Sequence, residues 1–210
     1  FDEALDSYDK AISLKPEYPE AYYNRANILL ELNHLNDALI CYDKAIKLKP
    51  DYAQAYYNKG NILLKLNRFD EAITSYNQTI RIEPNDEKAF CNRGLCFKNL
   101  NHYDQALDSY DQALILKPNY LDVINNKSRI LDELSRFNEA IVYYKKAIEI
   151  EPNLILPHYN LSITNLRLGN FKEGWQDYGW RWKVKDYIGT ELQTSKLSWD
   201  YKKTNKRLLI

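Results

Sequence analysis

The chain has 210 residues, of which 29 are basic and 29 acidic, so its formal net charge is zero and nothing in it favours nucleic acid or an anionic membrane. No apolar run approaches the roughly 18 residues of a membrane helix, and the start lacks the pattern of a signal peptide. The odd, sparse count of three cysteines is typical of a reducing compartment. We therefore expect a cytoplasmic protein without nucleic-acid or membrane partners.

One segment recurs along the chain every 34 residues, and its clearest copy is NDALICYDKAIKLKP at residues 36–50. The first alanine of this segment recurs at Ala4, Ala38, Ala72, Ala106 and Ala140. A tyrosine follows four residues later, at Tyr8, Tyr42, Tyr76, Tyr110, Tyr144 and Tyr178. A proline closes the first five copies. Such self-similarity predicts an array of structural repeats in which each unit contacts only its neighbours.

The chain begins inside a repeat. Phe1 stands just before a predicted helix that starts at Asp2 and ends before Pro16, and this helix corresponds to the second half of the later units. We therefore expect a truncated first repeat and a chain that is a piece of a longer protein.

Each full unit predicts two helices. With the recurring alanine as position twenty, the full units begin at Pro19, Ala53, Glu87, Leu121 and Ile155. The first helix should end in one left-handed residue, for which glycine and then asparagine are the best choices. These residues are Asn33, Asn67, Asn101, Ser135 and Gly169. The second helix should begin at a residue whose side chain caps its first turn. These predicted caps are Asp2, Asn36, Asp70, Asp104 and Asn138.

Small residues recur where the two helices should cross. Position eight of the first helix is Ala26, Gly60, Gly94, Ser128 or Ser162, and we expect it to face the alanines of the second helix. Tyr42 and its equivalents should fill the space between units. We therefore expect most of the tyrosines to be core residues without a functional role.

This pattern of a small residue at eight, alanine at twenty, an aromatic residue at twenty-four and proline at thirty-two resembles the tetratricopeptide repeat (TPR). The resemblance covers residues 1–184 and implies an all-α, right-handed superhelical solenoid of helix hairpins. We expect the second helix of a truncated repeat followed by five repeats, the last a degenerate cap. It also implies that the first helices line a concave surface that binds proteins or peptides.

Position six is asparagine in every full unit, and neighbouring positions supply tyrosines and further asparagines. The predicted peptide-binding residues are Asn24, Asn58, Asn92, Asn126, Asn160, Tyr23, Tyr57, Tyr159, Asn27 and Asn61. A primary amide both donates and accepts, so a ladder of amides could hold an extended peptide backbone. The same amides could instead join neighbouring helices and stabilise the stack. Both interpretations stay open.

The asparagine ladder resembles the repeats of the O-linked N-acetylglucosamine transferases and their bacterial relatives, in which such a ladder holds the polypeptide substrate. A chaperone-tail clamp would need cations at positions five and six. Because those positions hold tyrosine, cysteine or asparagine, we exclude a clamp.

The last unit departs from the pattern. Gly174 replaces the alanine, no proline follows, and tryptophans stand at Trp175, Trp180 and Trp182, which predicts a capping unit. Residues 185–210 read as a basic linker that ends in the first strand of a further domain, at 208–210. The series from Leu166 to Trp182, followed by Trp199 and Asp200, resembles the junction between repeats and a bacterial glycosyltransferase domain.

The sequence contains no catalytic motif, no metal-ligand spacing and no phosphate-binding loop, so we expect no enzyme activity, metal or cofactor in this chain. The function we expect is the substrate-binding arm of a larger bacterial glycosyltransferase-like protein. The alternative is a stand-alone scaffold that binds partner proteins or self-associates through exposed ends of the array.

Overall fold

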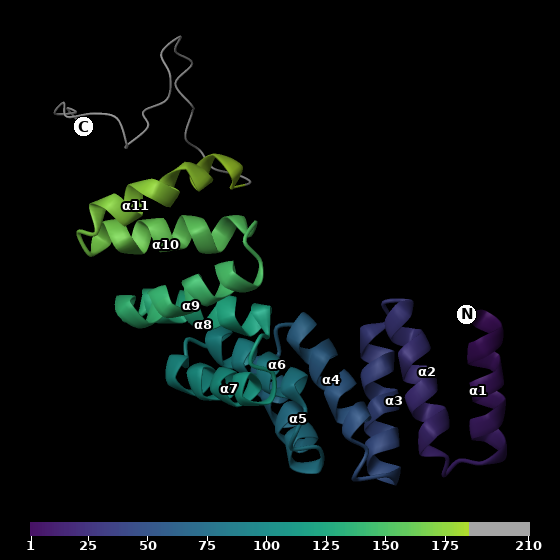
Figure 1. Cartoon of the computed structure of the whole chain (residues 1–210). Coiled ribbons are helices and arrows are strands. Elements are labelled where there is room, and N and C mark those ends of the chain that lie inside the picture. Colours follow the sequence, from purple (N-terminus) through teal and green to yellow (C-terminus); the bar gives the residue numbers. More distant parts are fainter. Residues whose placement is uncertain (185–210) are drawn as a thin grey trace. The chain divides into compact units, whose positions relative to one another are not determined.

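The computed structural model describes residues 1–184, and this part of the chain is entirely helical (Figure 1). It divides after Tyr120 into two compact units. The first unit contains α1 (Asp2–Leu14), α2 (Pro19–Glu31), α3 (Leu35–Leu48), α4 (Ala53–Lys65), α5 (Phe69–Ile82), α6 (Glu87–Asn99) and α7 (Tyr103–Leu116). The described part of the second unit contains α8 (Leu121–Glu133), α9 (Phe137–Ile150), α10 (Ile155–Arg167), α11 (Phe171–Asp177) and the 3-10 helix η1 (Tyr178–Lys183).

The helices pack as consecutive hairpins. The pairs α2–α3, α4–α5 and α6–α7 form the hairpins of the first unit, and α4 and α6 also pack on the second helix that precedes each of them. In the second unit the hairpins are α8–α9 and α10–α11. The first helices of these hairpins begin at the residues where the sequence repeats begin. The expected all-α solenoid of helix hairpins is confirmed.

The turn inside each hairpin is built on one left-handed residue, as the sequence predicts. The backbone angle φ is 60° at Asn33, 57° at Asn67, 58° at Asn101, 59° at Ser135 and 79° at Gly169. In the first turn, the amide of His34 donates to the carbonyl of Leu29 at 2.8 Å and that of Asn33 to Leu30 at 2.9 Å. This pair of bonds is a Schellman motif, which satisfies carbonyl groups at the end of the first helix.

The predicted caps of the second helices are wrong. The helices α3, α5, α7 and α9 begin one residue before the predicted caps, and their N-cap residues are His34, Arg68, His102 and Arg136, none of which forms a side-chain capping bond. The reason is the tight turn, because the residue that completes the Schellman motif also serves as the N-cap of the next helix. Asn36 and its equivalents therefore lie inside the first turn.

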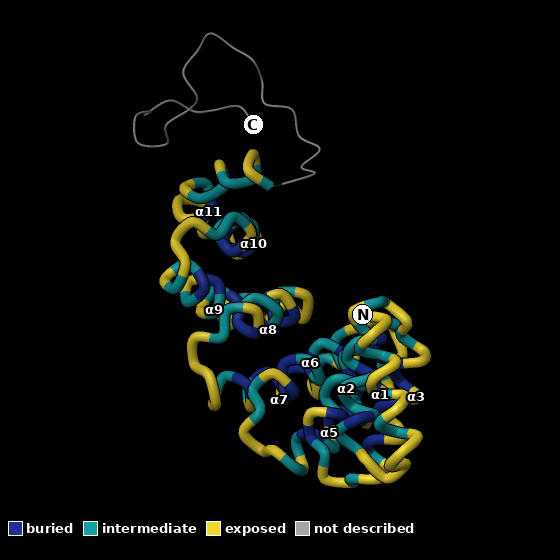
Figure 2. Tube along the Cα trace, turned by 90° about the vertical axis from the view of Figure 1, so that its right-hand side faces the viewer, coloured by how far each residue is buried: buried dark blue, intermediate teal, exposed yellow. Residues whose placement is uncertain are grey.

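The first four hairpins each bury a tyrosine ring of the second helix, and in two of them a glycine of the first helix lies against that ring. Tyr42, Tyr76 and Tyr110 are 0% exposed and Tyr144 is 2% exposed. A Cβ atom on Gly60 would lie 2.7 Å from Cε1 of Tyr76, and one on Gly94 would lie 2.6 Å from Cε1 of Tyr110. At Gly60 and Gly94, position eight therefore lies closest to the tyrosine ring of the second helix, a contact that the sequence analysis did not expect. Figure 2 shows that the loops between the helices are mostly exposed.

The last hairpin has a short second helix, which agrees with a cap. The helix α11 contains 7 residues, and the chain continues in η1, where Trp180 stacks on His158 of α10 with ring centroids 4.2 Å apart. Gly174 is needed here, since its Cβ would lie 2.7 Å from Leu166. The predicted linker and strand at 185–210 lie outside the described residues. Within residues 1–184, no helix has the length and apolarity required to cross a membrane.

We predict that Gly60→Leu lowers the free energy of unfolding by about 1–3 kcal/mol, because the new side chain overpacks the Tyr76 ring. Urea denaturation followed by circular dichroism measures this change. Lys44→Leu introduces the same side chain at an exposed position of α3 and should change the free energy by less than about 0.5 kcal/mol. Equal effects of the two substitutions would contradict the close contact.

Candidate functional site

The first helices of the first unit are joined by side-chain hydrogen bonds between tyrosines and asparagines. Oδ1 of Asn27 on α2 accepts from the Tyr42 hydroxyl at 2.5 Å and from Nδ2 of Asn58 on α4 at 3.1 Å. Nδ2 of Asn58 also donates to the Tyr23 hydroxyl at 3.2 Å. The amide of one repeat therefore bridges two side chains of the repeat before it, and one of these, Asn27, also accepts from the tyrosine buried in that repeat.

The next repeat has the same bonds. Oδ1 of Asn61 accepts from the Tyr76 hydroxyl at 2.8 Å and from Nδ2 of Asn92 at 3.0 Å. Nδ2 of Asn92 also donates to the Tyr57 hydroxyl at 3.3 Å. We call these bonded side chains the Tyr–Asn network; its members are Tyr23, Asn27, Tyr42, Tyr57, Asn58, Asn61, Tyr76 and Asn92.

Three tyrosines of the network, Tyr42, Tyr57 and Tyr76, stay protonated at neutral pH. Burial raises the pKa values of Tyr42, Tyr57 and Tyr76 above the ordinary value. Their hydroxyls therefore remain able to donate, as the bonds from Tyr42 and Tyr76 require. The network is a set of neutral groups held in fixed positions.

The structure brings seven of the ten predicted site residues into the first unit. Asn58 and Asn92 use their side-chain nitrogens within the network, which supports the interpretation that these amides join neighbouring helices. Their side-chain oxygens accept no hydrogen bond from residues 1–184. Asn24, half-buried on α2, makes no side-chain hydrogen bond with the described residues. Amide groups with unused bonding capacity are therefore present on α2, α4 and α6.

The three remaining predicted residues belong to the second unit. Asn126 on α8 and Tyr159 and Asn160 on α10 are half-buried. The helices α8 and α10 are joined by different chemistry, since Asp132 accepts from the Thr164 hydroxyl at 2.6 Å and from Arg167 at 2.8 Å. The asparagines at position six thus occupy the same place in their repeats. Within the described residues, however, only Asn58 and Asn92 of these five form the bonds of the Tyr–Asn network.

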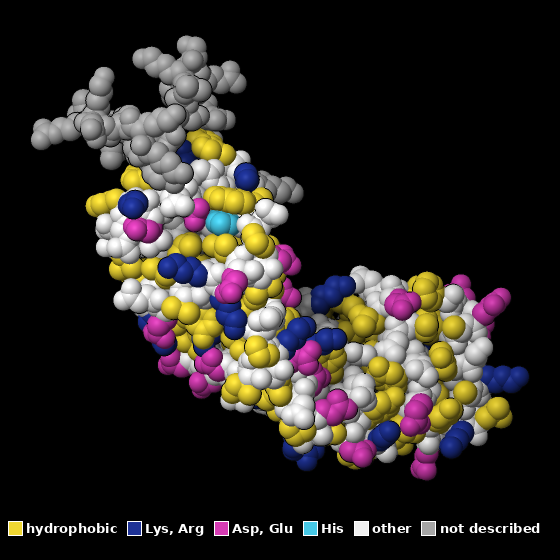
Figure 3. Space-filling view, viewed as in Figure 1, with side chains coloured by type: hydrophobic (Ala, Val, Ile, Leu, Met, Phe, Trp, Pro, Cys, Tyr) yellow, Lys and Arg dark blue, Asp and Glu magenta, His cyan; other side chains and the backbone are white. Residues whose placement is uncertain are grey.

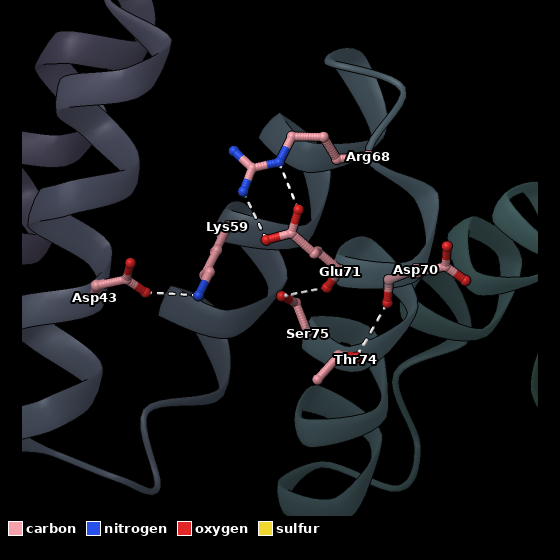
Figure 4. A network of polar contacts seen from close by, with 7 residues as sticks. All are labelled: Asp43, Lys59, Arg68, Asp70, Glu71, Thr74 and Ser75. Carbon is pink, nitrogen blue, oxygen red and sulfur yellow. Dashed lines mark hydrogen bonds and ion pairs between the residues drawn. The ribbon is translucent and has the colours of Figure 1, made fainter.

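A second set of links joins each first helix of the first unit to the second helix before it, and the sequence analysis missed it. Nε of Arg25 lies 2.7 Å from Oδ1 of Asp9, Nζ of Lys59 lies 2.6 Å from Oδ1 of Asp43, and Arg93 donates to Asn77 at 2.9 Å. Figure 4 shows the Lys59–Asp43 pair beside the Arg68–Glu71 pair. The constant spacing of 16 residues between the partners was a signal that could have found these links.

The charged side chains of the described residues are spread over the surface. Lys and Arg side chains alternate with Asp and Glu side chains over the face that Figure 3 displays. The Lys59–Asp43 and Arg68–Glu71 pairs border a groove of about 280 Å³ that also contains Ile40, which is 60% exposed. Exposed pairs of this kind contribute little to stability because solvent screens them.

The cysteines do not form a reactive site. Cys41, Cys91 and Cys96 are buried and form no disulfide within the described residues, and burial raises the pKa of the Cys96 thiol to about 12. A thiol with a raised pKa is a poor nucleophile at neutral pH. No group of three His, Cys, Asp or Glu side chains within residues 1–184 is arranged to hold a metal ion.

Sequence comparisons agree with this architecture. Tetratricopeptide-repeat models match residues 23–87 and 87–120, and a further TPR model matches residues 1–33 and 129–169. Together these matches cover most of the chain, which belongs to the tetratricopeptide-repeat family. No curated protein matches it by sequence.

Several solved structures have the same fold. YrrB, described as a TPR protein with an unusual peptide-binding site, is 25% identical, with a TM-score of 0.75 over 84% of this chain and 91% of that chain. MamA from Desulfovibrio magneticus RS-1 is 22% identical, with a TM-score of 0.68 over 72% of this chain and 85% of that chain. PilW, a type IV pilus biogenesis factor, is 20% identical, with a TM-score of 0.70 over 89% and 88%. The latter two likenesses concern the fold alone.

We predict that Asn61→Ala lowers the free energy of unfolding by about 1–3 kcal/mol, because it leaves the buried Tyr76 hydroxyl without its acceptor. In the Asn61→Ala background, the further change Tyr76→Phe should cost less than it does in the wild type. Urea denaturation of the four proteins gives the coupling energy, expected near 1 kcal/mol. Additive effects would show that the bond contributes nothing.

Proposed function

We propose that the chain is a non-catalytic module that binds an extended peptide segment of a partner protein on the first helices. The main observation behind this proposal is that the Tyr–Asn network holds Asn58 and Asn92 through their side-chain nitrogens. Their side-chain oxygens accept no hydrogen bond from the described residues. The proposed peptide-binding residues are Tyr23, Asn24, Asn27, Tyr57, Asn58, Asn61 and Asn92 in the first unit and Asn126, Tyr159 and Asn160 in the second.

The chemistry of these groups suits a peptide backbone. An extended peptide presents N–H donors at regular intervals, and amide oxygens held in one orientation accept from them with little loss of conformational entropy. Tyrosine and asparagine combine contact area with hydrogen bonding, as in many binding surfaces. The similarity to YrrB, a TPR protein with a peptide-binding site, supports the same assignment.

We further propose that the module is the substrate-binding arm of a cytoplasmic glycosyltransferase-like protein. The support is the resemblance of the asparagine ladder and of the terminal repeat to such proteins. In the described part of that repeat, Gly174 is packed against Leu166, and Arg181 lies over the rings of Tyr178 and Trp182. These contacts give a packing role to several residues of the junction motif, and the proposed role for the motif is to close the repeats before a transferase domain.

Self-association is a second candidate function, and the exposure of α1 favours it. This helix buries none of its residues completely, and Phe1 and Leu14 are 64% and 78% exposed. In α3 and α5 the residues equivalent to Ala4, Tyr8 and Ala11 are buried. A second copy of the chain could cover this apolar face, and sedimentation velocity over a hundredfold range of concentration tests this alternative. A monomer throughout rules it out.

We predict that Asn24→Ala weakens peptide binding about threefold to tenfold while leaving the free energy of unfolding within about 0.5 kcal/mol of the wild type. The physical reason is that its amide bonds no described residue and is therefore available to a ligand. Peptides selected from a random phage-displayed library on this chain serve as probes, and isothermal titration calorimetry measures their affinities.

Asn36→Ala is the matched control, because Asn36 is exposed on the second helix α3 and should not affect binding. Asn58→Ala should weaken binding and also lower stability, since it removes two bonds of the network. If no peptide is enriched on the wild type, or if Asn24→Ala binds like the Asn36→Ala control, peptide binding on this face is refuted.

We predict that an antibody against this fragment detects, in native cells, a protein several tens of kilodaltons heavier than the 24.9 kDa chain. Intact mass after immunoprecipitation measures it, and glycosylation of a protein acceptor by the full-length protein should fall in the Asn58→Ala, Asn92→Ala double variant. A native mass near that of the fragment would reject the transferase arm in favour of a stand-alone scaffold.

A further inference from the structure

The loops that lead into the first helices carry a recurring lysine–tyrosine pair in the first unit. In three of its four loops, the lysine before the proline lies over the ring of the tyrosine three residues later. The distances from Nζ to the ring centroid are 5.2 Å for Lys15–Tyr18, 4.6 Å for Lys49–Tyr52 and 4.5 Å for Lys117–Tyr120. These are cation–π distances.

The pair fills a defined place beside the Tyr–Asn network. The ring of Tyr52 lies 4.9 Å from the ring of Tyr23, and Tyr42 lies 5.8 Å from it. Tyr23 is therefore covered by an aromatic ring from its own repeat and by one from the loop. In this repeat the lysine–tyrosine pair occupies the space next to a predicted site residue.

The loop between α5 and α6 lacks the pair. Glu83 stands where the other three loops have lysine, and Asp86 stands where they have tyrosine. The ring centroid of Tyr57, the equivalent of Tyr23, lies 6.0 Å from that of Tyr76, which belongs to the same repeat. This loop contributes no tyrosine beside it. A hollow of about 550 Å³ is present instead, lined by Tyr57 and residues 83–88. We call this hollow the loop pocket.

The charge of the loop pocket is negative, and two of its carboxylates are held in place. Glu83 Oε1 accepts from Gln54 at 2.8 Å, and Asp86 Oδ1 accepts from the backbone amides of Lys88 and Ala89 at 2.9 and 3.0 Å. Glu87 adds a third carboxylate, and Lys88 is the single cation of the lining. The pKa of Tyr57 is raised, chiefly by burial and to a smaller extent by the negative charge of Asp86. The Asp86 carboxylate is therefore near enough to Tyr57 to interact with it electrostatically.

We propose that the loop pocket takes a lysine or arginine side chain of the peptide bound on the Tyr–Asn network. An incoming cation would lie near the Tyr57 ring and the carboxylates of Glu83 and Asp86. The cation of the ligand would thus take the place of the lysine–tyrosine pair that this loop lacks. The Tyr57 hydroxyl accepts from Asn92, so the loop pocket adjoins the proposed peptide path. This inference rests on the proposed function and adds to it a preference for basic segments.

The test is selection of peptides from a random phage-displayed library on the wild-type chain and on a variant with the pocket filled, E83K/D86Y. This variant copies the lysine and tyrosine of the other loops, whose helices α2 and α4 form without a capping side chain. We expect wild-type binders to share one lysine or arginine position and E83K/D86Y binders to lose it. A selected basic peptide should bind the variant roughly tenfold more weakly.

Two further variants separate charge from folding. E17Q/D51K raises the net charge by the same three units in exposed loops that keep their lysine–tyrosine pairs, and it should retain the basic preference. E83Q/E87Q keeps the Asp86 cap and should weaken the basic peptide and reduce the salt dependence of its binding. Enriched peptides without a shared basic position overturn this inference alone, whereas the absence of any enriched peptide overturns the proposed function with it.

Discussion

A tyrosine ring buried between two helices is the constraint on which the first unit depends. The ring at position twenty-four leaves no room for a large side chain at position eight, so Gly60 and Gly94 stand against Tyr76 and Tyr110. The hydroxyl of a buried tyrosine also needs a partner, because an unsatisfied one costs about 1–3 kcal/mol. Asn27 and Asn61 supply that partner for Tyr42 and Tyr76. One buried residue thus determines the identities of two others on the first helix.

The same acceptors connect the core of a repeat to the surface of the next one. Oδ1 of Asn27 accepts both the Tyr42 hydroxyl and the amide of Asn58, so the orientation of Asn58 depends on a buried group of the preceding repeat. Binding groups on flexible surface side chains lose rotamer freedom when a ligand arrives. For Asn58 and Asn92, the hydrogen bonds of the network have already removed that rotamer freedom when the chain folds. Structural and binding roles are therefore compatible at Asn58 and Asn92, since the nitrogen of each amide serves the stack and its oxygen is left for a partner.

Features that follow from local rules could be predicted from the sequence. The starts of the first helices and the left-handed residues Asn33 to Gly169 depend on spacing and on the conformational preferences of single residues. The capping error arose because the Schellman turn overlaps the start of the next helix, which composition does not reveal. The bonds of the Tyr–Asn network join residues 15 to 35 positions apart, so they depend on the packing of the two helices of a hairpin or on the packing of one repeat against the next. The tail at 185–210 lies outside the described residues, and its predicted strand stays a prediction.

Departures from the repeat distinguish positions that the core requires from positions that it does not. Every full repeat of the first unit has a buried tyrosine at position twenty-four. The loop position occupied by Tyr52 is, in contrast, occupied by Asp86 in the next loop, and α6 still forms there. The substitution even provides a capping side chain that α2 and α4 lack. A loop position can therefore change its chemistry at little cost to the fold, provided that the new residue satisfies the backbone. Such positions border the rigid Tyr–Asn network, so a repeat protein of this kind can alter its specificity in the loops while the network that presents the peptide backbone stays unchanged.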